Sequence, residues 1–518
     1  MELNTFSLHR EIIKGRARTQ VTFDEDYNLP DYKPDFSALI MSQGRIRIEE
    51  TKVTKGHVSI KGNLKFEILY RAEQVELGVS SLEGVVSFQE TLAVDEAQEF
   101  DSAQVSCELE DLSINVTNSR KLGVRALLDL SAVVSEFATE EFPEEMEGGQ
   151  NMEVLNRSVN CLHLKAEGKD QCRIHEEIDL PANKPNINEI LWKQVQIQGI
   201  QARPANGKIQ VQGEVSVSML YIGEPEARLE WHETSIPVSL SLEVPESDQD
   251  YICYVKADVQ EWNVQSQEDL EGEPRVISLD GILKVEYRLY EEQKRQMLGD
   301  LYALDKTLIP QREAVTVEHL LMKNESRCKV NDTLTLEQGQ KEILQICSCF
   351  GNVQLDHTEI QEDGILAEGA VHVQILYFTK EDQAPLDAVE GMLPFSYKIE
   401  VPQITPDCRF ELNTGIELLS VMMKSGSMME IQSVADFNVI VFKPEEIERI
   451  KTVEETPADM EEIQRMPGMT GLRIKSGDTL WKIAKENHTT IAEIKRTNQL
   501  PDEPLPEGTT ILLLKQVR

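Results

Sequence analysis

The sequence has few cysteines and no long apolar run, and each shortage excludes a class of protein. Its eight cysteines are scattered over 518 residues, and only Cys347 and Cys349 lie close together. A single C-x-C pair without a nearby histidine cluster is a weak metal signal, so we expect reduced thiols and no metal or cofactor. No stretch approaches the roughly 18 to 20 apolar residues that span a bilayer. Residues 1–19 do not resemble a signal peptide, so we expect the protein to stay in the compartment where it is made.

Positive charge is also in short supply. The chain has 52 Lys and Arg against 91 Asp and Glu, a formal net charge of −39. Phosphate-rich partners need clustered cations, so nucleic acid and anionic membranes are excluded as general partners. With 40% hydrophobic residues, the chain can nevertheless bury several ordinary cores, and its length suggests three or four domains.

An internal threefold repeat organises most of the chain. Segment Gly62–Tyr70 recurs as Gly213–Tyr221 and as Gly369–Tyr377, each ending in Leu-Tyr. The same spacings relate Leu29–Pro34 to Leu180–Pro185, although the third copy has lost both prolines of this element. Agreement at separated landmarks indicates true repeats.

Each copy shows the alternation of apolar and polar residues that is typical of β-strands, and none contains a long amphipathic helical pattern. We therefore predict a mainly β protein with three antiparallel domains, sandwich or barrel-like, at residues 6–135, 153–290 and 313–442. Acidic, Pro- and Gly-containing stretches predict a solvated linker over 136–152 and an acidic tether over 443–470.

The last residues, 471–518, differ in kind, because they carry eight basic against six acidic side chains. Strand-like alternation at Leu472–Lys475 is followed by a Ser-Gly-Asp turn, in which we expect Asp478 to cap the next helix. Thr490–Glu493 is a capping box that begins a second helix, and Ile511–Leu514 returns as a strand. The sequence predicts a β-α-α-β unit.

The motif Ile474–Ala484, the segment Asn498–Leu500 and the closing Pro506–Leu514 closely resemble the LysM module. LysM modules generally bind N-acetylglucosamine glycans such as peptidoglycan in a shallow groove between two loops. The resemblance implies a groove that binds glycan or a protein partner, formed by Gly477, Asp478, Thr479, Leu480, Trp481, Asn498, Gln499, Leu500 and Pro501.

Three of these residues also have a purely structural explanation. Gly477 supplies backbone freedom and Asp478 caps a helix, which the fold would require without any ligand. The Trp481 ring could stack on a sugar or contact a protein, but an aromatic in so small a module also completes the core. Partial burial with an exposed edge and full exposure both stay open.

The whole pattern resembles the SipL-type spore coat morphogenetic proteins of clostridia, whose β repeats are SPOCS domains and which end in one LysM domain. This resemblance implies a mother-cell protein at the forespore surface, within the spore coat. It also implies partners: the morphogenetic ATPase called stage IV sporulation protein A, contacted through LysM, and other coat proteins.

Enzymatic motifs are missing, since the sequence has no phosphate loop, dinucleotide turn, zinc-protease helix or esterase elbow. Glu110, Glu261 and Glu417 align between the copies, but one glutamate per repeat is better explained as a strand-face residue than as a catalytic pair. We therefore expect a non-enzymatic scaffold. The alternative is a cell-wall protein anchored to peptidoglycan by LysM, which would need export.

Overall fold

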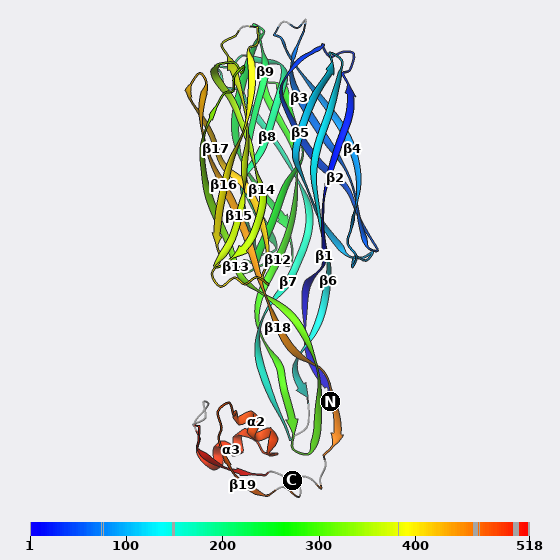
Figure 1. The fold of residues 1–518 in the computed structure, drawn as a ribbon, viewed down its shortest axis with the longest axis vertical. Coiled ribbons are helices and arrows are strands. Elements are labelled where there is room, and N and C mark those ends of the chain that lie inside the picture. The colour runs from blue at the N-terminus through cyan, green and yellow to red at the C-terminus, as the bar shows by residue number, and fades with distance from the viewer. Residues whose placement is uncertain are drawn as a thin grey trace.

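The protein is elongated, with β-sandwiches at one end, a stalk in the middle and a small helical domain at the other end (Figure 1). The computed structural model describes residues 2–73, 75, 77–147, 151–381, 383–458, 461, 465, 467–500 and 507–515. The helices in these residues are too short or too polar to cross a bilayer. The prediction of three repeated antiparallel β domains followed by a β-α-α-β unit is confirmed.

Each copy of the repeat consists of two three-stranded antiparallel sheets packed face to face. The strand orders are β2-β3-β4 and β1-β6-β5 in the first copy, β8-β9-β10 and β7-β12-β11 in the second, and β14-β15-β16 and β13-β18-β17 in the third. The strands of the first copy are β1 (Glu2–Asn28), β2 (Phe36–Thr54), β3 (His57–Ala72), β4 (Val79–Ala93), β5 (Ser102–Asn118) and β6 (Lys121–Glu147).

The other two copies repeat this topology strand for strand. The second contains β7 (Met152–Asp179), β8 (Asn186–Ala205), β9 (Lys208–Glu224), β10 (Arg228–Glu243), β11 (Ile252–Glu268) and β12 (Pro274–Ala303). The third contains β13 (Lys306–Thr335), β14 (Ile343–Gln361), β15 (Gly364–Thr379), β16 (Leu386–Glu400), β17 (Arg409–Ser425) and β18 (Met428–Pro457).

The repeated Leu-Tyr pair explains how the copies join. Neighbouring residues of a strand point to opposite faces of the sheet. Tyr70, Tyr221 and Tyr377 each lie in the core of their own sandwich. The preceding leucines, Leu69, Leu220 and Leu376, instead meet in one shared cluster between the copies. Strand β4 lies against β8, β10 against β14 and β16 against β2, so the three sheets close a ring around this cluster.

Three two-stranded ribbons leave the sandwiches and form the stalk (Figure 1). They are the extensions of the pairs β1–β6, β7–β12 and β13–β18. All three ribbons contribute to one buried cluster, which contains Leu8, Phe142, Val159, Met297 and Val317. Burial of these apolar side chains holds the ribbons together.

The structure corrects the predicted linker and tether. Residues 136–147 belong to β6 and pair with the start of β1, and residues 443–457 belong to β18 and pair with the start of β13. Most of the glutamates, such as Glu141, Glu145, Glu445 and Glu448, are exposed, while Phe142, Met146 and Ile450 are buried. The partner strand is distant in sequence, so the local composition did not reveal it. The rest of the predicted tether lies only partly within the described residues.

In two of the copies, but not in the third, side-chain hydrogen bonds hold the loop between the first and second strands. The Tyr70 hydroxyl donates to the Pro34 carbonyl at 3.1 Å, and Tyr221 donates to Pro185 at 3.3 Å. Beside each tyrosine, an arginine donates to carbonyls of the same loop, for example Arg120 to Pro30 at 2.9 Å and Arg275 to Pro181 at 2.9 Å.

The third copy has lost these partners. Ser427 occupies the position of the arginine. Its backbone carbonyl accepts from the Leu336 amide at 2.9 Å, just as the backbone carbonyl of Arg120 accepts from the Leu29 amide. Both prolines are absent from Leu336–Lys341. The buried Tyr377 hydroxyl finds no hydrogen-bond partner among the described residues.

We therefore predict that replacing the tyrosine by phenylalanine changes the free energy of unfolding by different amounts in the three copies. Tyr221→Phe removes a made hydrogen bond and should destabilise the protein by about 1 kcal/mol. Tyr377→Phe removes only a buried hydroxyl without a protein partner and should be neutral or stabilising. Urea unfolding midpoints of the two variants test this, with Tyr70→Phe as a second positive control. Equal losses at Tyr221 and Tyr377 would contradict it.

Candidate functional site

The C-terminal domain is a small unit of two strands and two helices. It consists of β19 (Met469–Arg473), α2 (Leu480–Glu486), α3 (Ile491–Asn498) and β20 (Thr510–Leu514), and β19 pairs with β20 in antiparallel fashion. Its core is formed by buried aliphatic side chains, namely Ile474, Leu480, Ile483, Ala484, Ile494, Ile511 and Leu513. This arrangement agrees with the predicted β-α-α-β order.

The loop before α2 and the first residue of α2 hold four of the predicted groove residues. Gly477 has a φ of +83°, a conformation that favours glycine. Asp478 does not cap the helix, because α2 begins later than expected and its carboxylate instead accepts from the Lys475 amide at 2.8 Å. Thr479 is the N-cap, accepting from the Lys482 amide at 3.2 Å. Leu480 is buried in the core.

The last residue of α3 and the loop after it hold the other side of the predicted groove. Thr490 caps α3 as expected, since its side chain accepts from the Glu493 amide at 3.1 Å. Asn498 joins α3 to β20, donating to the Leu512 carbonyl at 2.7 Å and accepting from the Leu512 amide at 2.6 Å. Gln499 is exposed with a φ of +52°, and Leu500 is half-buried against the core. Pro501 lies outside the described residues.

Gly477, Thr479 and Gln499 are thus exposed, whereas Leu480 is structural and Asn498 is held by the fold. The binding role of all the groove residues stays a prediction.

Trp481 has a partner that the sequence did not indicate. Only 9% of its surface is exposed, because α2 packs on the tip of the stalk. The indole Nε1 donates to Oδ2 of Asp300 at 2.8 Å. The Trp481 ring also meets the Tyr302 ring edge-on, with centroids 4.9 Å apart.

Two further side chains, Lys485 and Tyr302, complete this contact. The Lys485 ammonium lies 2.8 Å from both carboxylate oxygens of Asp300. The Tyr302 hydroxyl donates to the Thr489 carbonyl at 2.9 Å. Both stalk residues belong to β12, far from the domain in sequence.

The electrostatics of Asp300 favour its charged form. Burial alone would raise the pKa of its carboxyl group, but hydrogen bonds from Lys485 and Trp481 outweigh burial and hold the pKa below its usual value. Arg312 of β13 adds a third donor at 2.9 Å. Reasoning from the sequence missed Asp300 and Tyr302; the apolar residues around them, Met297, Leu298 and Leu301, were the signal that this segment is not a simple joint.

Comparison with known protein families decides the relationship of the chain. The model described as "SipL, SPOCS domain" matches residues 35–117, 186–267 and 342–424, and the LysM domain model matches residues 472–513. Together these segments cover more than half of the chain. The chain belongs to the SipL-like proteins. No curated protein and no solved structure matches it significantly.

This SipL-like protein is therefore associated with the sporulation coat and carries a LysM domain, a type of domain associated with peptidoglycan binding. Each SPOCS match begins at or next to the first residue of β2, β8 or β14 and ends within β5, β11 or β17. The matches leave out the stalk ribbons.

The aligned glutamates of the SPOCS domains lie on three different sheets. Glu110 is on β5, Glu261 on β11 and Glu417 on β17. Glu261 lies 3.6 Å from Arg47, and Glu417 forms an ion pair with Arg327. A glycosidase needs two carboxyl groups held across one bond, whereas these glutamates lie one on each of three sheets and two of them are paired with arginines.

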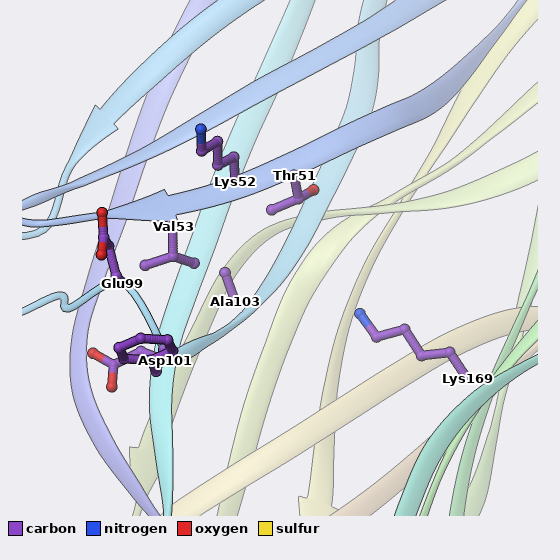
Figure 2. Close-up of a pocket in the computed structure, with 8 residues that line it drawn as sticks. Thr51, Lys52, Val53, Glu99, Asp101, Ala103 and Lys169 are labelled. Carbon is purple, nitrogen blue, oxygen red and sulfur yellow. The ribbon is translucent and has the colours of Figure 1, made fainter.

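An open depression lies beside the first SPOCS domain (Figure 2). Glu99 and Asp101 lie on one side of it, and Lys169 projects from a separate element on the other. Asp101 is already engaged, since it pairs with Lys14 at 3.0 Å and accepts from the Gln98 amide at 2.7 Å. Within the described ranges, no group of three potential metal ligands occurs, and all eight cysteines are free.

The three hydrogen bonds of Asn498 predict a structural role. Asn498→Ala breaks two bonds to Leu512 and one to the Ile494 carbonyl, and should destabilise the LysM domain by about 2–3 kcal/mol. Asn487→Ala, which breaks one side-chain bond to the Ile483 carbonyl, should cost about 1 kcal/mol and is the matched control. Hydrogen exchange at the Leu512 and Leu513 amides in the full chain measures both. Equal protection in the two variants would contradict the prediction.

Proposed function

We propose that this protein is a non-enzymatic spore coat morphogenetic scaffold. It acts in the mother-cell cytoplasm at the forespore surface, where its LysM domain contacts the morphogenetic ATPase called stage IV sporulation protein A. The SPOCS domains present exposed sheet faces and strand edges to other coat proteins. In this scaffold each β copy extends through its stalk ribbon, over residues 2–147, 152–303 and 306–457, and residues 471–518 are the LysM unit.

The observation that carries the proposal is the separation of two kinds of domain. The three SPOCS domains gather at one end of the molecule, and the single LysM domain lies at the far end of the stalk (Figure 1). A linker between two layers of an assembly needs binding surfaces that do not obstruct each other. Because the three ribbons share a hydrophobic core, the stalk is a stiff spacer and not a flexible linker.

The distribution of charge supports a protein partner for LysM. The module has a small positive net charge, whereas the rest of the chain is strongly acidic. A basic module is attracted to an acidic protein surface, and this complementarity favours specific association. A lone LysM also lacks the gain in effective concentration that tandem modules obtain on a polymer.

The placement of acidic side chains supports the absence of catalysis. Two of the aligned glutamates are paired with arginines on separate sheets, and Asp101 of the open depression is paired with Lys14. Among the described residues, neither the aligned glutamates nor the open depression thus offers a free pair of carboxylates.

The alternative is a peptidoglycan-binding cell-wall protein anchored by LysM. The LysM match itself favours it, because such domains are associated with N-acetylglucosamine glycans. The two functions differ in the ligand of the same groove, so groove variants that keep the fold distinguish them.

The double variant Asp478→Asn, Gln499→Gly is suited to this test. Asparagine can still accept from the Lys475 amide, and glycine tolerates the positive φ of residue 499, so the fold should hold. We expect binding of the purified ATPase to fall roughly tenfold or more, the usual effect of losing central contacts. Pull-down of the ATPase and sedimentation with purified peptidoglycan measure the two ligands side by side.

A chain ending at Pro457 is the negative control, because it removes LysM but keeps β18 whole. Truncation near Lys443 would instead remove a stalk strand. If the double variant binds the ATPase fully and loses only peptidoglycan, the scaffold proposal is wrong and the cell-wall alternative is favoured.

A further inference from the structure

The contact between LysM and the stalk tip combines apolar and charged parts. Leu155 and Leu304 of the stalk join the same hydrophobic cluster as the LysM core. At its edge, Asp300 accepts from Trp481 and Lys485, and its side chain is only 16% exposed. Burying a carboxylate is costly unless donors surround it. Without the LysM domain, Asp300 would keep Arg312 but lose both donors from α2.

The contact uses a different face of LysM from the exposed groove residues. Trp481, Lys485 and Thr489 meet the stalk, whereas Gly477, Thr479 and Gln499 stay exposed. The docked domain can therefore bind a ligand through these residues without leaving the stalk. The stalk also fixes the direction in which they point.

We propose that Asp300 and Tyr302 are positioning residues for the LysM domain: they hold α2 on the stalk tip and so orient the groove toward its partner. This inference rests on the proposed function for the identity of that partner. Trp481 then acts as a docking residue rather than as a sugar-stacking residue. Substitutions at Trp481 impair partner binding through lost orientation, not through a lost ligand contact.

Docking is measured on the full chain without any partner, by acrylamide quenching of tryptophan fluorescence. Trp192 is buried in the cluster between the copies and Trp262 in the second sandwich, and Trp231→Phe removes the half-exposed fourth tryptophan from the background. Asp300→Ala should shift the ratio of docked to undocked protein roughly tenfold or more toward the undocked form, because charge-assisted bonds are lost. Trp481 then becomes open to quenching.

Matched variants separate docking from folding. Lys485→Ala removes the same ion pair from the LysM side, and its effect should not add to that of Asp300→Ala. Tyr302→Phe removes only the bond to Thr489 and should give a smaller effect. Asp280→Ala on the same strand, whose partner is His175, should leave quenching unchanged. Unchanged hydrogen exchange in β20 shows that the LysM fold is intact.

A second measurement tests the consequence of docking. Asp300→Ala should weaken capture of the ATPase severalfold, although the groove residues are untouched. If acrylamide quenches the tryptophan fluorescence of Lys485→Ala and Asp300→Ala no more than that of Asp280→Ala, the docking claim is overturned. If they undock the domain but capture is unchanged, the positioning role is overturned while the proposed function stands. If wild-type protein docks but never captures the ATPase, the proposed function fails and the docking result is unaffected.

Discussion

Antiparallel pairing of the first and last long strand of each copy is the constraint on which the rest of the structure depends. Strand β1 pairs with β6 from Glu2 opposite Glu147 to Asn28 opposite Lys121, and β7–β12 and β13–β18 do the same. One end of each pair is a wall of the sandwich, and the other end is a ribbon of the stalk. Because the same strands serve both parts, the stalk is rigidly continuous with the sandwiches. The ends of neighbouring copies also meet at the stalk tip, where β12 leads into β13.

The Leu-Tyr pair shows how a repeat can build two cores from one strand. Tyrosine fills the sandwich of its own copy, while the preceding leucine fills the core between copies. A strand with one buried face would need only alternation, but here both faces are covered at this point. The third copy shows which part of this design is dispensable. It has lost the prolines and the arginine that clasp the loop, yet Leu376 still reaches the shared cluster. The junction between copies thus constrains the repeat more strongly than the loop does.

The repeats, their β structure and the LysM unit could be predicted, because they follow from local periodicity and from specific motifs. The stalk could not. Its glutamates around Phe142 and Ile450 have the composition of a linker, and only pairing with a strand more than a hundred residues away makes them β structure. The helix cap was misplaced by one residue, because Asp478 and Thr479 are both good N-caps. The role of Trp481 was beyond reach for a further reason: its partner, Asp300, belongs to another domain, and no local pattern pairs residues across domains.

The short connection between the stalk and LysM makes a modest contact sufficient for docking. Strand β18 ends at Pro457 and β19 begins at Met469, so the intervening chain spans roughly 40 Å at most. A domain confined to that distance has an effective concentration in the millimolar range. A contact worth about 4 kcal/mol, which is a millimolar affinity, is then enough to populate the docked form substantially. The contact is stabilised by the bonds at Asp300, the Tyr302 ring contact and the apolar packing at Leu155. Their combined free energy, less the cost of desolvating Asp300, is expected to be of this order. Docking therefore depends on the length of the connection as well as on Asp300. On a long linker, the same LysM surface would be docked on the stalk less often. The direction of its groove would then no longer be fixed.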